Sequence, residues 1–147
     1  MIISAPGLDG RGASTDGLVE LVDVYPTLTA LCGLPAPGGV EGTSLVPLLS
    51  KADLPWKTAV FSQFPRARQG HRHRGPGDIM GYAVRTERHR YIEWRDWKSG
   101  RVEARELYDH HVDSGEMRNL AGDPERGGEL EMLRGVLEKG WRGALPE

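Results

Sequence analysis

Met80-Gly-Tyr-Ala-Val-Arg-Thr-Glu-Arg-His-Arg-Tyr-Ile-Glu-Trp94 contains two runs of strand-forming residues with a short polar turn between them. The runs from Met80 to Thr86 and from Arg90 to Asp96 have the length of strands, and Glu87-Arg88-His89 joins them. A third such run, Val102 to Tyr108, follows after Lys98-Ser99-Gly100. Because such short connections join neighbouring antiparallel strands, the pattern predicts an antiparallel meander.

Further elements flank this meander on both sides. Ala59 to Phe64 is an apolar and β-branched run that predicts another strand. After the meander, Asp123-Pro124-Glu125 is typical of a helix start. The apolar residues beyond it recur at spacings of three and four, which places them on one helix face: Leu130, Leu133, Leu137 and Trp141. We therefore predict a C-terminal helix that covers the sheet.

The first 50 residues predict a separate strand and helix. Ile2 to Ser4 indicates a short buried strand. Asp23 is a predicted N-cap, with a side chain that could accept hydrogen bonds from the first turn of a helix running from Val24 to Cys32. Gly33 can supply the left-handed residue that ends this helix. Thr43 to Leu49 predicts a short helical turn.

Composition and charge narrow the class of protein. A chain of 147 residues can bury on the order of 70% of its unfolded surface, but 20 Gly and 10 Pro indicate many loops. The net charge of −2 gives no general attraction to nucleic acid or to an anionic membrane, and we expect neither as a partner. The single cysteine, Cys32, excludes an intramolecular disulfide, and we expect it to be a small buried side chain.

Several segments resemble the type I sulfatases, a family of the alkaline-phosphatase-like superfamily. Arg105-Glu-Leu-Tyr-Asp-His-His-Val-Asp-Ser-Gly-Glu-Met-Arg-Asn-Leu-Ala121 resembles their C-terminal signature. Leu18-Val-Glu-Leu-Val-Asp-Val-Tyr-Pro-Thr-Leu-Thr-Ala-Leu-Cys-Gly-Leu34 resembles their strand-to-helix unit, in which Asp-x-x-Pro-Thr-Leu opens the helix. Ser62-Gln63-Phe64-Pro65-Arg66 and residues 80–94 are most similar to the iduronate-2-sulfatase branch.

The resemblance implies an α/β fold, which would be α+β in an isolated piece. Residues 1–50 would be the last strand, helix and linker of a large sulfatase domain. Residues 51–147 would be the small C-terminal subdomain, with an antiparallel sheet of about four strands and a C-terminal helix. The abrupt apolar start at Met1-Ile-Ile-Ser4 agrees with this division, and we expect the chain to be truncated.

The resemblance also implies sulfate-ester hydrolysis, but by residues upstream of these segments. The family nucleophile is a formylglycine hydrate made within Cys/Ser-x-Pro/Ala-x-Arg, and calcium polarises the sulfate. Cys32-Gly-Leu-Pro-Ala36 and Ser4-Ala-Pro-Gly-Leu8 both lack the required arginine. We therefore assign no catalytic residue and no metal ligand, and expect the chain to be inactive alone. Its expected partners are the N-terminal catalytic part, in the same polypeptide or a companion chain, or a second copy through self-association.

One loop, from Arg66 to Asp78, is strongly basic, since four arginines and two histidines precede its first acid. The resemblance implies that it borders the pocket mouth, where a sulfated or carboxylated sugar would suit its arginines. The candidate substrate-binding residues are Arg66, Arg68, His71 and His73. A solvated loop without a site is the alternative. For the whole chain, the alternatives are a non-catalytic module that binds polyanions or sulfated glycans, and part of a related phosphonate or phosphodiester hydrolase.

Other polar and aromatic residues are more typical of structure than of chemistry. Asp109, His110 and His111 could form a catalytic or metal site, but an Asp at a strand end usually stabilises a turn. Aromatic residues on the predicted strands could stack on a sugar, but packing is their usual role: Tyr82, Tyr91, Trp94, Trp97 and Tyr108. The strand arginines are expected to face solvent or pair with neighbouring acids: Arg85, Arg88, Arg90 and Arg95.

Overall fold

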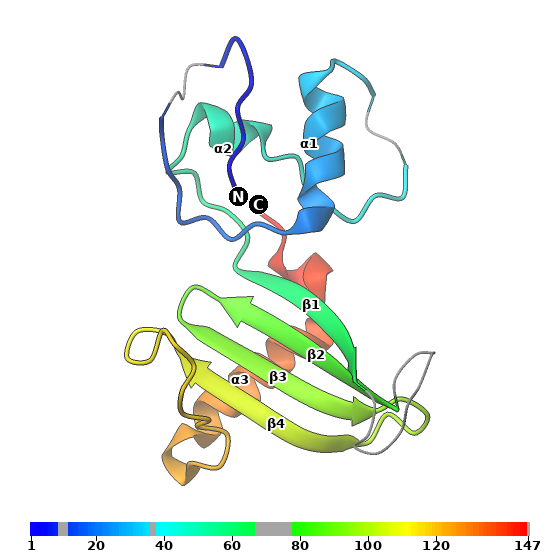
Figure 1. Ribbon diagram of the computed structural model, residues 1–147, viewed down its shortest axis with the longest axis vertical. Helices are drawn as coiled ribbons and strands as arrows, with labels where there is room; N and C mark the ends of the chain where they lie inside the picture. Colours follow the sequence, from blue (N-terminus) through cyan, green and yellow to red (C-terminus); the bar gives the residue numbers. More distant parts are fainter. Residues whose placement is uncertain (9–11, 36–37, 67–77, 147) are drawn as a thin grey trace. The chain divides into compact units, whose positions relative to one another are not determined.

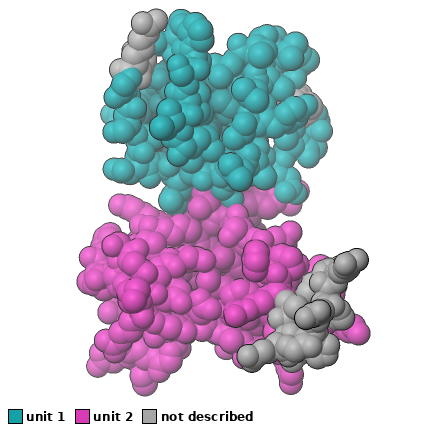
Figure 2. Space-filling model, in the orientation of Figure 1, with its two compact units in different colours: residues 1–58, 145–147 teal, residues 59–144 magenta. Residues whose placement is uncertain are grey.

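The computed structural model describes residues 1–8, 12–35, 38–66 and 78–146. The chain divides into two compact units, which are residues 1–58 with 145–147, and residues 59–144 (Figure 2). The elements of the first unit are η1 (Leu21–Asp23), α1 (Val24–Leu31) and α2 (Val46–Ser50). Those of the second are β1 (Ala59–Arg66), β2 (Ile79–Thr86), β3 (His89–Asp96), β4 (Val102–Asp109), η2 (Pro124–Arg126), α3 (Gly127–Lys139) and η3 (Trp141–Ala144).

The second unit is a four-stranded antiparallel sheet covered by one long helix (Figure 1). The strand order is β1-β2-β3-β4, so each strand pairs with its neighbour in the sequence. Gly81 of β2 lies opposite both Phe64 of β1 and Trp94 of β3. The meander, the additional strand and the C-terminal helix predicted from the sequence are confirmed.

The core of this unit lies between the sheet and α3. Its buried members come from all four strands, from α3 and from η3: Ala59, Val84, Tyr91, Leu107, Leu133 and Ala144. Leu133 is fully buried at the centre of the predicted apolar face of the helix. Burying a side chain of this size contributes about 1.5–3 kcal/mol, so this contact fixes the helix on one side of the sheet. We call the other side, to which alternate strand residues point, the open face.

The C-terminal helix begins as predicted but ends earlier. Asp123 accepts a hydrogen bond from the backbone N–H of Glu125 at 3.0 Å, which makes it a true N-cap. At the other end, Gly140 adopts a left-handed φ of 69°, which terminates α3 at Lys139. Trp141 therefore lies in η3, not on the face of the long helix as the spacing predicted.

The first unit is organised around the carboxylate of Asp23. This side chain is fully buried and accepts hydrogen bonds from the backbone N–H groups of Glu20 at 2.9 Å and Thr43 at 2.8 Å. It also accepts two hydrogen bonds from Lys57 Nζ. It makes no capping hydrogen bond to α1, so that prediction is wrong. The same carboxylate instead joins three separate segments of the unit.

Two other predictions for the first unit are also wrong. Ile2 is 98% exposed and Ile2 to Ser4 form no strand, because no described strand of this unit lies beside them. Cys32 is exposed, because it follows the last residue of α1, where the chain turns away through Gly33 at a φ of 66°. The predicted helical turn at Thr43 to Leu49 forms as α2, shifted to Val46–Ser50.

Candidate functional site on the open face of the sheet

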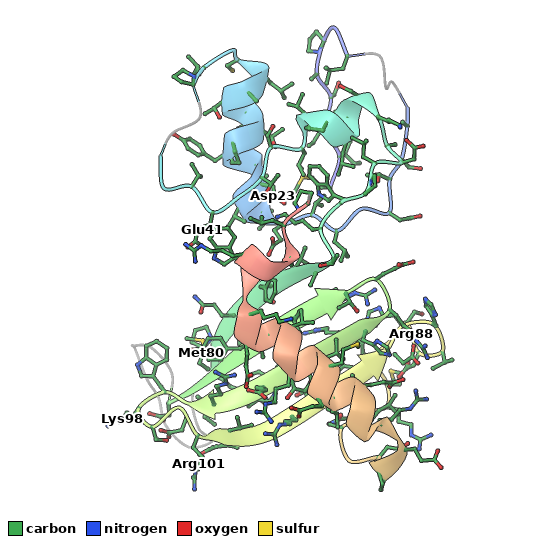
Figure 3. All side chains as sticks on the ribbon, turned by 180° about the vertical axis from the view of Figure 1, so that it is seen from behind. Asp23, Glu41, Met80, Arg88, Lys98 and Arg101 are labelled. Carbon is green, nitrogen blue, oxygen red and sulfur yellow. The ribbon has the colours of Figure 1, made fainter. Side chains whose placement is uncertain are left out.

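Only one of the four predicted substrate-binding residues has a described position. Arg66 is the last residue of β1 and is exposed. Arg68, His71 and His73 lie outside the described residues. The candidate site therefore consists of Arg66 and the described residues around it, at the end of the sheet where β1 ends and β2 begins. Figure 3 shows Met80, Lys98 and Arg101 at this end and Arg88 at the other.

Arg66 stacks on an aromatic ring of the open face. Its guanidinium carbon lies 5.4 Å from the centroid of the Trp94 ring, which is within the range of a cation–π contact. Arg66 forms no ion pair with any acid in the part of the chain that the structure describes. Its positive charge is therefore held in place by the ring but is not neutralised by any acid that the structure describes.

The position of Trp94 follows from its neighbours on both adjacent strands. A Cβ atom at Gly81 would lie 2.7 Å from Trp94 Cζ3, so only glycine lets the ring lie so close to the backbone of β2. On the other side, Trp94 Nε1 donates a hydrogen bond to Glu106 Oε1 at 2.7 Å. Glu106 Oε2 accepts a second one from the Tyr108 hydroxyl at 2.9 Å. The ring is thus fixed at its face and at its edge.

Burial, and then the hydrogen bond to Glu106, raise the pKa of Tyr108 above its ordinary value. The Tyr108 hydroxyl therefore remains a proton donor at neutral pH.

Arg88, Arg90 and Arg95 pair with acids, as the sequence predicted, whereas Nη1 of Arg85 is buried without a hydrogen-bond partner among the described residues. Arg90 Nη1 pairs with Glu116 Oε2 at 2.5 Å, and the other oxygen of Glu116 lies 2.8 Å from His110 Nε2. Arg95 Nη2 pairs with Glu93 Oε2 at 2.6 Å. These cations have their charge satisfied within the fold, which distinguishes them from Arg66.

Asp109 serves the turn that follows β4, together with a nearby arginine. It is fully buried, accepts a hydrogen bond from the backbone N–H of His111 at 3.1 Å, and receives two from Arg88 at 3.0 and 2.6 Å. These contacts, with Arg88 first, hold the pKa of Asp109 well below its usual range. The carboxylate is committed to structure, so it is not available as a general base.

Sequence reasoning missed a buried carboxylate on the helix side of the sheet. Glu93 is 2% exposed and accepts a hydrogen bond from the Tyr91 hydroxyl at 2.6 Å and one from Arg95 Nε at 2.8 Å. Burial alone would raise its pKa, but these contacts hold the pKa of Glu93 below its usual value. Burial and Glu93 raise the pKa of Tyr91 to about 12. One pattern in the sequence could have indicated this buried group. Tyr91 and Arg95 lie two residues before and two residues after Glu93, which places all three side chains on the same face of the strand.

Metal and membrane sites find no support in the described residues. Among residues 1–8, 12–35, 38–66 and 78–146, no three His, Cys, Asp or Glu side chains gather closely enough to hold a metal ion. Over the same residues, no helix has the length and apolar character needed to cross a membrane.

A family model described as "N-sulphoglucosamine sulphohydrolase, C-terminal" matches residues 1–140. The chain belongs to this family. Arylsulfatase K of Danio rerio is 29% identical to the chain over 144 residues, which are 94% of the chain and 25% of that protein. The sulfatase C-terminal region predicted from the sequence is thereby confirmed, whereas the iduronate-2-sulfatase branch is not. The chain spans about a quarter of the length of this relative.

One solved structure agrees with the family assignment, and a second agrees with the fold. A structure described as a 2-O GAG sulfatase has 30% sequence identity and a TM-score of 0.58, over 80% of this chain and 23% of that chain. The phosphonate monoester hydrolase of Agrobacterium radiobacter has 23% identity and a TM-score of 0.64, over 82% of this chain and 24% of that one. The second likeness shows the fold alone. The fold class predicted from the sequence is confirmed.

Proposed function

We propose that this chain is the C-terminal part of a sulfatase whose complete form hydrolyses sulfate esters of sugars or glycans. The observation that carries the proposal is the family match over residues 1–140, in a chain that covers a quarter of its curated relative. Under this proposal, residues 1–50 complete the large domain and residues 51–147 form the small subdomain. The chain supplies scaffold and part of the rim of the substrate pocket.

The groups that break the sulfate ester would lie in the remainder of the enzyme. The 147 residues contain no Cys/Ser-x-Pro/Ala-x-Arg segment that could mature to formylglycine. When present elsewhere, formylglycine would supply the nucleophile, and calcium would neutralise charge on the sulfate oxygens. The N-terminal catalytic part is accordingly the partner that we propose for this chain, in the same polypeptide or in a companion chain.

The residues of this chain would contribute substrate binding at the rim. Arg66, Arg68, His71 and His73 would face the anionic sugar, since a guanidinium can form paired hydrogen bonds with a sulfate or a carboxylate. The exposed, unneutralised charge of Arg66 supports this role. The resemblance of residues 62–66 and 80–94 is the ground on which we also propose the iduronate-2-sulfatase branch.

A non-catalytic module that binds sulfated glycans is the second candidate, favoured by the same free charge on Arg66. A phosphonate hydrolase has less support, because its likeness to this chain shows only the fold. Retention on a heparin column at moderate salt by a chain with no catalytic companion would favour the module.

The genomic DNA upstream of the Met1 codon tests the proposed function. An in-frame segment that encodes Cys/Ser-x-Pro/Ala-x-Arg, or a neighbouring gene that encodes it, is the expected result. A natural start at Met1 without any such companion would overturn the proposal. In the complete enzyme, Arg66→Ala should raise the KM for a sulfated sugar with a smaller effect on kcat. An unchanged KM and kcat would show that Arg66 does not contribute to substrate binding at the rim.

A further inference from the structure

We infer that Trp94 is a positioning residue that holds Arg66 in place, and that the two side chains together bind one sulfated or carboxylated sugar unit on the open face. This inference rests on the proposed function, because it names how a sugar of that class would be recognised. The residues concerned lie on β1, β2 and β3 at one end of the sheet.

The first step is the arrangement of aromatic rings across the glycine. Phe64, Gly81 and Trp94 stand side by side on β1, β2 and β3. Phe64 is 66% exposed, although it is a large apolar side chain. Because the Trp94 ring lies over Gly81 and carries the Arg66 guanidinium, the exposed Phe64 side chain is the apolar surface that remains beside them. Such a surface suits the C–H face of a sugar ring, which stacks on aromatic side chains.

The second step is the charge beside this surface. Arg66 lies two residues beyond Phe64 on the same strand face, and its guanidinium rests over the Trp94 ring. Stacking on a ring leaves the N–H groups at the edge of the guanidinium available to a ligand. A sugar ring on the aromatic surface could then place a sulfate or carboxylate against Arg66, where paired hydrogen bonds can form.

The third step is rigidity. The hydrogen bond from Trp94 Nε1 to Glu106 and the contact with Gly81 keep the ring from turning. A long side chain such as that of Arg66 loses roughly 1.5–2 kcal/mol of conformational entropy when it is ordered. The ring orders much of it before any ligand binds, which lowers the cost of binding. This is the physical sense in which Trp94 positions Arg66.

The chemistry of the surface favours a sugar over nucleic acid. Binding to a phosphate backbone depends on several cations that together neutralise several phosphates. The described residues of the open face instead offer two arginines without an ion-pair partner, the exposed Arg66 and the partly buried Arg85, and the chain carries a net charge of −2. These residues are suited to a ligand that has one anionic group beside the apolar face of one sugar ring.

Calorimetric titration of the 147-residue chain with a heparin tetrasaccharide, and with the same tetrasaccharide desulfated, tests the inference. We expect Arg66→Ala and Trp94→Ala each to weaken binding about tenfold, as for the loss of one charge-assisted contact. The double variant should lose little more than either single one, because the two residues act as a unit. Trp94→Phe, which keeps an aromatic face, should restore most of the affinity.

Two further variants separate positioning from folding. Gly81→Ala should displace the Trp94 ring and weaken binding while both binding residues are present. Arg134→Ala removes an exposed arginine of α3 that pairs with Glu131 and Glu138, and should leave the affinity unchanged. Circular dichroism of each variant confirms that the sheet is intact.

Several outcomes would overturn the inference. The inference is wrong if the unmodified chain does not bind the tetrasaccharide, or if it binds the desulfated tetrasaccharide equally well. It is also wrong if the double variant loses as much affinity as the two single variants combined, or if a single-stranded polynucleotide binds as tightly as the tetrasaccharide. The genomic test of the proposed function does not depend on these affinities. If a catalytic companion is found but this surface binds no sugar, the inference about Trp94 and Arg66 fails. If this surface binds the sugar but no companion exists, the proposed function fails.

Discussion

Lys57 Nζ lies 2.7 Å from Oδ1 of Asp23, and the side chains of both residues are almost completely buried. The same ammonium group also contacts Glu20 Oε2 at 2.8 Å. One residue pair thereby connects the start of α1 to a segment 34 positions later in the chain. In this chain, the aspartate of the Asp-x-x-Pro-Thr segment forms a buried ion pair and a capping box at η1, but it does not cap α1.

Removal of the cation from this pair should destabilise the first unit. In Lys57→Met, the carboxylate of Asp23 stays buried without its charge partner, and we expect a loss of about 3–5 kcal/mol in the free energy of unfolding. Urea denaturation followed by tryptophan fluorescence measures it. Lys51→Met, at an exposed position, is the matched control and should change stability by less than about 0.5 kcal/mol. Similar values for the two variants would show that the pair contributes little.

The close approach of two backbone segments makes Gly42 intolerant of a side chain. A Cβ atom at this position would lie 2.0 Å from the carbonyl oxygen of Val22, closer than any real contact. Gly42→Ala should cost more than about 2 kcal/mol, because backbone atoms must move apart. Gly38→Ala has open space and should be close to neutral. Equal melting temperatures for the two variants would contradict this packing.

Acid should destabilise the second unit through Asp109. Its pKa is lower in the folded protein than in the unfolded chain, chiefly because of Arg88. Its contribution is therefore fully present above the unfolded pKa of roughly 3.9 and is lost as the pH falls toward the folded value. Unfolding free energies measured from pH 7 to pH 2 should fall less steeply in Arg88→Ala than in the parent chain. Arg101→Ala, which removes an exposed arginine, should leave the slope unchanged.

The exposed apolar side chains around α1 should cause association. Leu21, Val22, Tyr25 and Leu28 are each more than half exposed, which is unusual for a continuous set of large apolar residues. Sedimentation velocity should show self-association, or a heterodimer when a catalytic companion is present. Leu28→Glu should shift the chain toward monomer, whereas Met132→Glu on α3 should not. A monomeric parent chain at high concentration would contradict the prediction.

Regular periodicity made much of the second unit predictable. Three runs of strand-forming residues with short polar connections, between Met80 and Tyr108, indicated the meander, and the spacing of Leu130, Leu133 and Leu137 indicated the helix that covers it. The end of that helix was missed because Gly140, not the apolar pattern, stops it. A glycine with a positive φ can end a helix even where the spacing of apolar residues continues beyond it.

Contacts between distant residues could not be predicted from the sequence. Asp23 looked like a helix cap because its partner Lys57 is 34 positions away. The stacking of Arg66 on Trp94 depends on the register of three strands and on the absence of a side chain at Gly81. The sequence could nominate Arg66 as a candidate, but only the structure shows the ring that holds it.

The central claim is that the groups that break a sulfate ester lie outside this chain. Turnover of 4-nitrophenyl sulfate by the highly purified 147-residue protein, with calcium added, tests it most directly. We expect no hydrolysis above the rate of a protein-free control at any concentration of the chain. Hydrolysis that rises in proportion to the concentration of the chain, and that persists through successive purification steps, would contradict it.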